Sequence, residues 1–427
     1  MTPMTPVPDL PPADVARLTA DWEALAAFRD QAQPGWTRRV FSEPYARSRA
    51  WLRARMADAG LRVRSDGAGN LIGELDGSDP GLPALVTGSH SDTVASGGRF
   101  DGVVGVLGAL EVVRLLRDSG TTLRHPLRVV DFLGEEANDF GLSCIGSRAV
   151  AGALTAEHLA LVDPDGRTLG AALAAHTGGD PRDALAAAWD ADDVAAFVEL
   201  HIEQGRRLEA AGVPIGVVSA IAGIARCTVV CDGRPDHAGT TAMADRRDAL
   251  TAAAEVVLAV ERVAAEAGGD VVGTTGRVAV EPGAVSIVPA RARLWAELRS
   301  TDAAVLERLR ARLEDAAASI GRRRGVTVSL AWTGVSRPVP TDPGVRDAIV
   351  AAAGRLGLPT LTVPSGAGHD AAFLARLAPM GMVFVPSRDG RSHCPEEWTD
   401  LDQVARGADV LAATLLELDR DEDLDRT

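Results

Sequence analysis

The chain has 427 residues, enough for two or more domains with large cores. Its net charge of −15 argues against nucleic acid or an anionic membrane surface as the main partner. All 44 basic residues are arginine, which excludes a mechanism based on a Schiff-base lysine or a phosphate-loop lysine. No apolar run has the length of a membrane span, and the proline-rich N-terminus does not resemble a signal peptide, so we expect a cytoplasmic protein.

The first half of the chain has the pattern of an α/β domain. Apolar residues recur at helical spacing in some segments, whereas others are short apolar or alternating runs typical of strands. In chain order, we predict helices at 14–31, 44–59 and 102–116, and strands at 61–64, 70–75, 83–89, 127–133 and 195–203.

The pattern changes after Pro214 and returns to α/β after residue 335. We predict strands at 215–232, 271–280, 287–299 and 326–332 and helices at 242–267 and 301–324. This β-α-β-β-α-β order is typical of a ferredoxin-like domain. We therefore expect a catalytic domain formed by 1–214 and 335–427, with an inserted α+β domain at 215–334. Further helices are predicted at 345–356, 371–377 and 401–418, further strands at 360–363 and 380–385, and a disordered tail at 419–427.

A histidine and two aspartates gather just after the predicted strand 83–89. His90 comes directly after this strand, and Asp101 lies in a glycine-rich turn further on. Ligands collect at the carboxyl ends of strands in open α/β sheets. A histidine that binds a metal needs its other ring nitrogen held, and Asp92 is placed to hold it.

Two adjacent glutamates, Glu135 and Glu136, follow the apolar strand 127–133. Adjacent carboxylates repel each other, so at the end of an apolar strand they need a cation beside them. A solvated loop is the simpler interpretation of this pair alone, but His90 and Asp101 favour a metal site. Five of the eight histidines stand among small or acidic residues, whereas His125, His158 and His176 look like loop or surface residues. The five are His90, His201, His237, His369 and His393.

From residue 37 to residue 398 the chain resembles the M20 metallopeptidase superfamily, and more closely its hydantoinase/carbamoylase branch. This branch contains N-carbamoyl-L-amino acid hydrolases and allantoate amidohydrolases. The motifs that carry the resemblance are 88–93 (GSHSDT), 135–136 (EE), 201–205 (HIEQG), 237–241 (HAGTT), 365–370 (SGAGHD) and 386–393. The resemblance implies an α/β fold: a metal-dependent exopeptidase-like catalytic domain with an inserted ferredoxin-like dimerisation, or lid, domain.

The same resemblance implies two divalent metal ions per subunit. Asp101 would bridge the ions, His90 and His201 would complete one, and Glu136 and His393 the other. Imidazole and carboxylate ligands suit zinc, manganese or cobalt alike. Glu135 would be the general base that takes a proton from water and passes it to the leaving nitrogen.

Substrate contacts are also implied by the resemblance. His237 would stabilise the oxyanion and, as in relatives, would reach the active site of a partner subunit, which implies a homodimer. Arg299 would hold the substrate carboxylate through its bidentate fork. Gln204, His369 and Gly368 match further positions that contact a small ureido or amide substrate.

The chain departs from the branch where relatives carry two asparagines, because Gly283 and Ser286 stand there instead. The leading hypothesis is a two-metal amidohydrolase that converts an N-carbamoyl-L-amino acid to the amino acid, ammonia and carbon dioxide. Allantoate or another ureido acid is the nearest alternative substrate. An aminoacylase or dipeptidase is disfavoured by His201, where such relatives usually have a carboxylate. A non-enzymatic metal-binding scaffold is disfavoured by Glu135.

Overall fold

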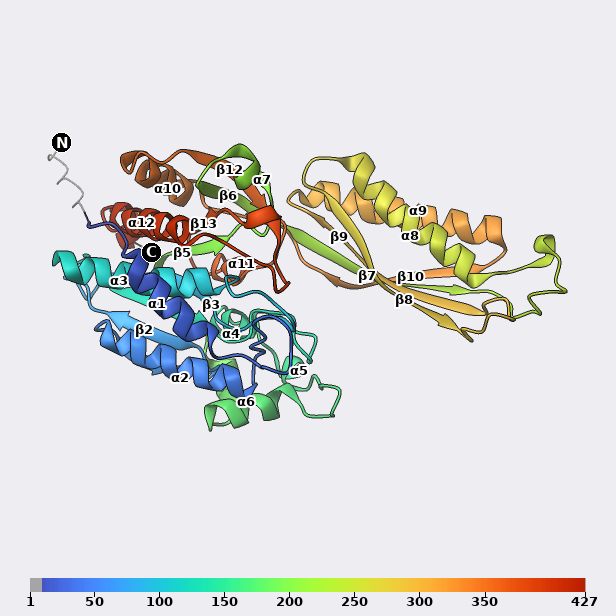
Figure 1. Ribbon diagram of the computed structural model, residues 1–427, viewed down its shortest axis with the longest axis horizontal. Helices are drawn as coiled ribbons and strands as arrows, with labels where there is room; N and C mark the ends of the chain where they lie inside the picture. The colour runs from blue at the N-terminus through green and yellow to red at the C-terminus, as the bar shows by residue number, and fades with distance from the viewer. Residues whose placement is uncertain (1–9, 427) are drawn as a thin grey trace. The chain divides into compact units, whose positions relative to one another are not determined.

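The computed structural model describes residues 10–426. The chain divides into two compact units, which are described separately (Figure 1). The first unit contains the residues up to 219, 341–363 and those from 369 onward; the second contains 220–340 and 364–368. The boundaries predicted for the inserted domain, 215 and 334, stay a prediction.

The first unit is built on a mixed sheet whose central strands are parallel. The strand order is β1-β2-β4-β3-β5-β13-β6, and β12 also pairs with β6. Strands β4, β3, β5 and β13 run parallel, and β3, β5 and β13 are buried along their whole length, as parallel strands covered on both faces are. The strands are β1 (Arg62–Ser65), β2 (Leu71–Leu75), β3 (Ala84–His90), β4 (Leu127–Phe132), β5 (Val194–Ile202), β6 (Ile215–Ile221), β12 (Thr360–Ser365) and β13 (Met380–Val385).

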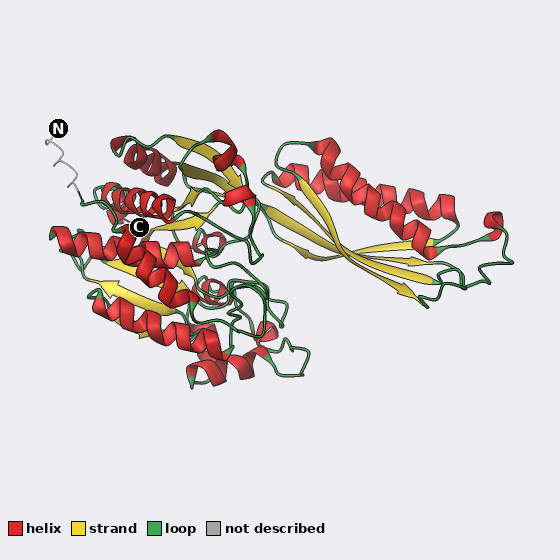
Figure 2. Ribbon diagram, viewed as in Figure 1, coloured by secondary structure: helices red, strands yellow, loops and turns green. Residues whose placement is uncertain are grey.

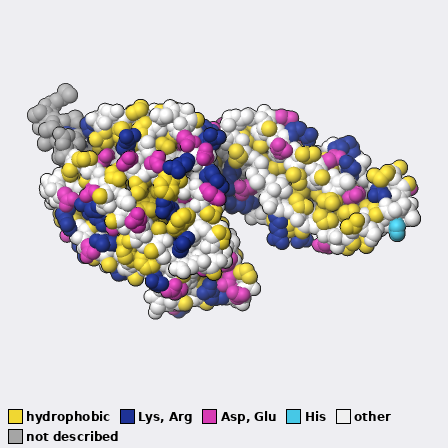
Figure 3. Space-filling model, viewed as in Figure 1, with side chains coloured by type: hydrophobic (Ala, Val, Ile, Leu, Met, Phe, Trp, Pro, Cys, Tyr) yellow, Lys and Arg dark blue, Asp and Glu magenta, His cyan; other side chains and the backbone are white. Residues whose placement is uncertain are grey.

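Helices cover this sheet, and α3 packs most closely. A Cβ on Gly105 would lie 2.4 Å from the carbonyl oxygen of Leu200 in β5, so the small residues of this helix allow close contact with the sheet. In Figure 3, basic and acidic side chains are interspersed over the visible face of this unit. Its helices are α1 (Val15–Ala26), α2 (Glu43–Asp58), α3 (Val103–Ser119), α4 (Ile145–Val150), α5 (Ala156–Leu159), α6 (Leu169–Thr177), α7 (Arg207–Ala211), α10 (Pro343–Arg355), α11 (Ala371–Leu374) and α12 (Leu401–Leu418).

The second unit is a four-stranded antiparallel sheet with two helices on one face (Figure 2). The strand order is β10-β7-β9-β8, which confirms the ferredoxin-like expectation. Its core lies between the sheet and α8 and α9. The elements of the sheet and its helices are β7 (Gly223–Asp232), α8 (Ala249–Ala267), β8 (Val272–Glu281), β9 (Arg291–Ser300), α9 (Ala303–Arg324) and β10 (Thr327–Val335). The short strand β11 (Val339–Pro340) follows in the chain and is not part of this four-stranded sheet.

Several predicted boundaries were wrong; the helix predicted at 14–31 ends at Ala26, and the helix predicted at 371–377 ends at Leu374. The strand predicted at 215–232 is interrupted at Ala222, and its two parts, β6 and β7, belong to different sheets. The helix predicted from 242 begins at Ala249, because the Asp248 side chain accepts the N–H groups of Leu250 and Thr251 as an N-cap. The strand predicted from 287 begins at Arg291, after Pro289, which has no N–H for a sheet ladder.

The described part of the C-terminal tail, 419–426, is ordered, contrary to expectation. Leu424 is buried, and Asp425 pairs with Arg124 and with Nε2 of His125, at 3.1 Å from the latter. His125 is therefore not a surface residue but a fully buried one, whose Nδ1 lies 2.7 Å from the Pro83 carbonyl oxygen. The proline-rich segment 1–9 lies outside the described residues. None of the described helices is both long and apolar enough to cross a membrane.

Candidate metal centre

The carboxyl ends of the central strands bring the predicted metal ligands together. His90 ends β3 and His201 is the penultimate residue of β5, its parallel neighbour. Glu136 follows β4, which pairs with β3 on the other side. Asp101 lies in the turn before α3, and His393 follows β13. Adjacent parallel strands end at one edge of a sheet, so residues far apart in sequence converge there.

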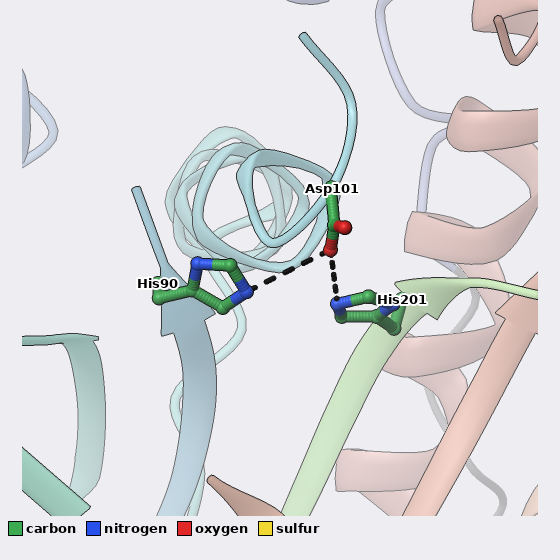
Figure 4. A group of neighbouring side chains, drawn as sticks. All are labelled: His90, Asp101 and His201. Atoms are coloured by element: carbon green, nitrogen blue, oxygen red, sulfur yellow. Dashed lines mark ion pairs between the residues drawn. The ribbon is translucent and has the colours of Figure 1, made fainter. Parts of the chain in front are cut away.

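One oxygen of Asp101 faces two buried histidines (Figure 4). Its Oδ1 lies 3.2 Å from Nε2 of His201 and 3.7 Å from Nε2 of His90. Both histidines are only 1% exposed. These three residues form a compact donor group of two imidazoles and one carboxylate. We refer to it as the inner group.

The other oxygen of Asp101 faces a second group of donors. Its Oδ2 lies 3.1 Å from Nε2 of His393, and the same nitrogen lies 3.3 Å from Oε1 of Glu136. We refer to Asp101, Glu136 and His393 as the outer group. A carboxylate whose two oxygens face separate donor groups is arranged to bridge two cations. Imidazole and carboxylate donors fit zinc, manganese or cobalt.

The histidines of the inner group are oriented by main-chain carbonyls. Nδ1 of His201 lies 2.9 Å from the carbonyl oxygen of Ile202, and Nδ1 of His90 lies 3.1 Å from that of Asp92. The Asp92 carboxylate is 3.5 Å from the same nitrogen and instead accepts the N–H groups of Glu135 and Glu136, at 3.2 Å each. Asp92 thus supports His90 through its backbone and the glutamate loop through its side chain. Because Nδ1 is held in each ring, Nε2 is the nitrogen that faces Asp101.

Glu135 is buried between the inner group and Cys144. Its Oε2 lies 3.6 Å from Nε2 of His90, and its Oε1 accepts the Cys144 thiol at 3.4 Å. Burial raises the pKa of Glu135 well above its usual range, against the opposing charge of His90, and nearby Glu136 raises it further. A carboxyl whose pKa is raised toward neutrality can both accept and donate a proton.

The pKa values of the outer group are shifted by burial and by the neighbouring charges. Burial and the charge of Asp101 raise the pKa of Glu136 to about 7. A hydrogen bond to Asp101 raises the pKa of His393 to about 9, against partial burial. Burial alone would raise the pKa of Asp101, but hydrogen bonds from His201 and His393 hold it well below its usual range. A divalent cation would displace such protons, so its binding is coupled to pH.

Two other predicted residues lie beside the centre. Nε2 of Gln204 donates to Oδ2 of Asp101 at 2.7 Å, and its Oε1 is buried without a partner among the described residues. The His369 ring packs edge-on against His201 with ring centroids 4.6 Å apart. Burial and the charge of His201 hold the pKa of His369 well below its usual range, so this imidazole is neutral.

Three predicted residues belong to the second unit. His237 is exposed, and its Nδ1 accepts the Gly239 N–H at 3.0 Å, which places the proton of the neutral ring on Nε2. Arg299 binds Oε1 of Glu297 through Nε at 2.8 Å and donates to the Gly366 carbonyl at 2.8 Å. Gly368 is exposed.

The loop that departs from the branch lies next to His237 within the second unit. The Ser286 carbonyl accepts the N–H of Ala238 at 2.9 Å, and His237 forms a β-bridge with Ile287. Gly283 has a φ of 72°, a conformation that favours glycine or asparagine. Ser286 therefore borders the predicted oxyanion residue, and Gly283 precedes it by three residues in the sequence.

Sequence reasoning gave no role to three side chains around the centre: the buried Glu199 and Glu397 and the half-buried Ser392. Glu199 accepts the Ser89 hydroxyl at 2.7 Å and the Ala371 N–H at 3.3 Å, and with His201 and His369 it forms a third possible donor group. Its signal was the alternation along strand 195–203, which places Glu199 on the face of His201. Ser392 and Glu397, which follow β13, gave no such periodic signal.

Comparison with known proteins identifies the family of this chain. The model of peptidase family M20/M25/M40 matches residues 86–417. An N-carbamoyl-L-amino-acid amidohydrolase of Paenarthrobacter aurescens is 40% identical over 409 residues, covering 96% of this chain and 99% of that protein. The ureidoglycolate hydrolase of Arabidopsis thaliana is 38% identical over 415 residues, covering 96% of this chain and 87% of that protein.

A solved structure has the same fold. The hydantoinase/carbamoylase family amidase of Burkholderia multivorans aligns with a TM-score of 0.87 and 35% identity, covering 95% of this chain and 98% of that one. The chain therefore belongs to peptidase family M20/M25/M40, in its hydantoinase/carbamoylase branch, and is a metal-dependent hydrolase.

Proposed function

We propose that this protein is a two-metal amidohydrolase that cleaves the carbamoyl C–N bond of an N-carbamoyl-L-amino acid. The observation that carries the proposal is the Asp101 carboxylate, whose two oxygens face separate donor groups beside the buried Glu135. The hydrolysis of a C–N bond other than a peptide bond is common to the amidohydrolase and ureidoglycolate hydrolase relatives. Such an enzyme would work in the cytoplasm.

The inner and outer groups would each hold one divalent ion, with Asp101 shared between them. Zinc, manganese and cobalt all suit this donor set. When bound, two such ions lower the pKa of water and polarise the substrate carbonyl. The raised pKa of Glu136, at about 7, means that its carboxyl must lose a proton to serve as a ligand.

Glu135 would move the proton during hydrolysis. Its carboxylate takes a proton from the attacking water as the oxygen bonds to the carbamoyl carbon. The C–N bond to the terminal amino group then breaks, and Glu135 returns the proton to that nitrogen, which leaves as ammonia. The carbamate that remains loses carbon dioxide to give the amino acid. The Asp92 carboxylate accepts the main-chain N–H of Glu135 and so holds that residue in place.

The second unit would supply the remaining groups. The Nε2 proton of His237, in the tautomer set by Gly239, would stabilise the oxyanion in the active site of a partner subunit, so the working form would be a homodimer. Arg299 would bind the substrate carboxylate by exchanging Glu297 for it. Gln204, His369 and Gly368 would complete the contacts.

A ureido acid such as ureidoglycolate or allantoate is the second candidate substrate. The plant ureidoglycolate hydrolase is 38% identical to this chain, nearly as similar as the carbamoyl-amino-acid enzyme at 40%. Gly283 and Ser286 also stand where relatives carry asparagines, and Ser286 lies beside His237, in a loop that would face the polar end of the substrate. These two changes are at positions expected to affect which ureido or carbamoyl substrate the enzyme prefers.

A substrate panel tests the proposal. The protein is reconstituted with Zn²⁺, Mn²⁺ or Co²⁺ and incubated with N-carbamoyl-L-amino acids, ureidoglycolate, allantoate, an N-acetyl amino acid and a dipeptide. We expect ammonia and free amino acid from the carbamoyl compounds, with Glu135→Gln as the inactive control. Faster release from ureidoglycolate or allantoate would favour the second candidate. Release of amine without ammonia, from the acetyl compound or dipeptide alone, would contradict both.

A further inference from the structure

One buried carboxylate outside the predicted ligand set holds the loop that carries Asp101. Glu397 is 2% exposed, and its Oε1 accepts the N–H groups of Phe100 at 2.7 Å and Asp101 at 3.0 Å. Its Oε2 accepts the Ser392 hydroxyl at 2.7 Å. Ser392 directly precedes His393. Glu397 therefore joins the segment of the bridging aspartate to the segment of the exposed histidine.

The surroundings of Glu397 are shaped to keep it there. A Cβ on Gly98 would lie 2.1 Å from the Glu397 carboxyl carbon, so only glycine leaves room for the carboxylate. The neighbouring Trp398 packs edge-on against Phe100, with ring centroids 5.4 Å apart, and stacks on the guanidinium of Arg99 at 4.6 Å. The pair Glu397–Trp398 thus contacts the chain from residue 98 to residue 101.

Glu397 and Asp101 compete for the single hydroxyl hydrogen of Ser392. The Ser392 oxygen lies 3.1 Å from Oδ2 of Asp101 as well as 2.7 Å from Glu397, but a hydroxyl has one hydrogen to donate. The shorter contact assigns it to Glu397. Gln204 Nε2 donates to Oδ2 of Asp101 at 2.7 Å and lies 3.3 Å from the Ser392 oxygen, which can accept its second hydrogen. Ser392 therefore donates no hydrogen bond to Oδ2 of Asp101. This oxygen keeps a lone pair that faces His393 and Glu136.

We propose that Glu397 is a positioning residue of the metal centre: it draws the Ser392 hydroxyl away from Asp101 and so keeps Oδ2 available to the outer cation. This inference rests on the proposed two-metal function. In Glu397→Gln, the amide oxygen still accepts the two main-chain N–H groups, but the amide nitrogen can only donate to Ser392. The hydroxyl must then turn to Oδ2 of Asp101 and compete with the cation for it.

The test is a Co²⁺ titration of metal-free protein, followed by visible absorption and calorimetry. Wild-type protein should bind two Co²⁺ ions. Glu397→Gln should bind the first with unchanged affinity and the second about 10- to 100-fold more weakly, the range that residues supporting metal ligands typically control. Ser392→Ala in the Glu397→Gln background should restore the second affinity to that of Ser392→Ala alone, because no hydroxyl is left to turn.

Matched controls separate this role from a structural one. The adjacent Glu396 is exposed and pairs with Arg391 at 2.9 Å, so Glu396→Gln should leave both affinities unchanged. If circular dichroism shows that Glu397→Gln does not fold, Gly98→Ala replaces it, since its methyl group displaces the same carboxylate. Unchanged affinity for the second ion in the folded variant, or additive effects in the double variant, would overturn the inference. Failure of wild-type protein to bind two ions would instead contradict the proposed function.

Discussion

The inner and outer groups share Asp101 but differ in their surroundings. In the inner group, His90 and His201 lie at the ends of buried parallel strands and are 1% exposed. In the outer group, the His393 side chain is 50% exposed and its residue has a φ of 56° in a loop. The inner donors are therefore fixed by the sheet, whereas the outer donors depend on loop contacts. We expect the outer cation to exchange more readily than the inner one.

Glu135→Gln should have the largest effect on catalysis while sparing both groups. Loss of a general acid and base costs about 10²- to 10⁴-fold in rate. We expect kcat to fall in this range, with two Co²⁺ ions still bound, because Glu135 is not a member of either group. The exposed Glu157 offers a control as Glu157→Gln. A normal kcat in Glu135→Gln would show that Glu135 is not the general acid and base.

A matched pair of histidine variants separates the two groups directly. His201→Ala should lose the inner ion and also lower the free energy of unfolding of the metal-free protein by about 1–3 kcal/mol, because a buried side chain is removed. His393→Ala should lose only the outer ion and, because its side chain is 50% exposed, should lower the free energy of unfolding by less than His201→Ala does. Calorimetric metal counts and urea unfolding measure both. Equal losses of unfolding free energy in the two variants would contradict the difference in burial between the inner and outer groups.

Gly102→Ala should disturb the inner group, because the added methyl group would collide with the His90 ring. Gly102 has a φ of 67°, and a Cβ there would lie 2.4 Å from Nε2 of His90. Displacement of a catalytic geometry by about 1 Å costs about 10²-fold, so we expect kcat to fall by roughly that factor. Gly141 has a similar φ of 72° with nothing within 4 Å, so Gly141→Ala reports the backbone cost alone. Similar kcat losses in the two variants would show that contact with His90 is irrelevant.

The smallest effect expected is a pH dependence of stability that arises in the outer group. The pKa of Glu136 is raised to about 7 and that of His393 to about 9, so folded metal-free protein binds more protons than unfolded protein. The stability from these groups is therefore present at low pH and lost as pH rises through those values. We expect the Tm of metal-free protein to fall between about pH 5 and pH 9, and added Co²⁺ to offset the fall. In His393→Ala the fall should be shallower above about pH 7; an identical slope would contradict this origin.

The sequence predicted the fold class because its local signals agreed with one another. Alternating and apolar runs marked the strands, and helical spacing of apolar residues marked 102–116, where α3 lies. The misplaced start of β9 followed from giving apolar content more weight than the missing N–H of Pro289. His125 and the charged tail were misjudged together, since the two contact each other through Asp425 and neither contact is visible in the sequence.

The site was predictable where residue type and position in a motif carry the chemistry. The structure brings His90, Asp101, Glu136, His201 and His393 together, as the motifs suggested. The supporting residues were not predictable in the same way. Glu396 and Glu397 are identical neighbours in the sequence, yet one is exposed and the other buried on Asp101. Only the folded arrangement of Gly98 and Trp398 distinguishes them.

The order of the ligands along the chain has a consequence for damage and synthesis. His90, Asp101, Glu136 and His201 all precede the second unit in the sequence, whereas His393 follows it. A nascent chain that has not passed residue 393, or a chain cut between residues 340 and 393, can therefore carry every inner donor and still lack an outer one. Such a cut would separate one proposed outer ligand from the rest of the set and leave His90 and His201 on one fragment.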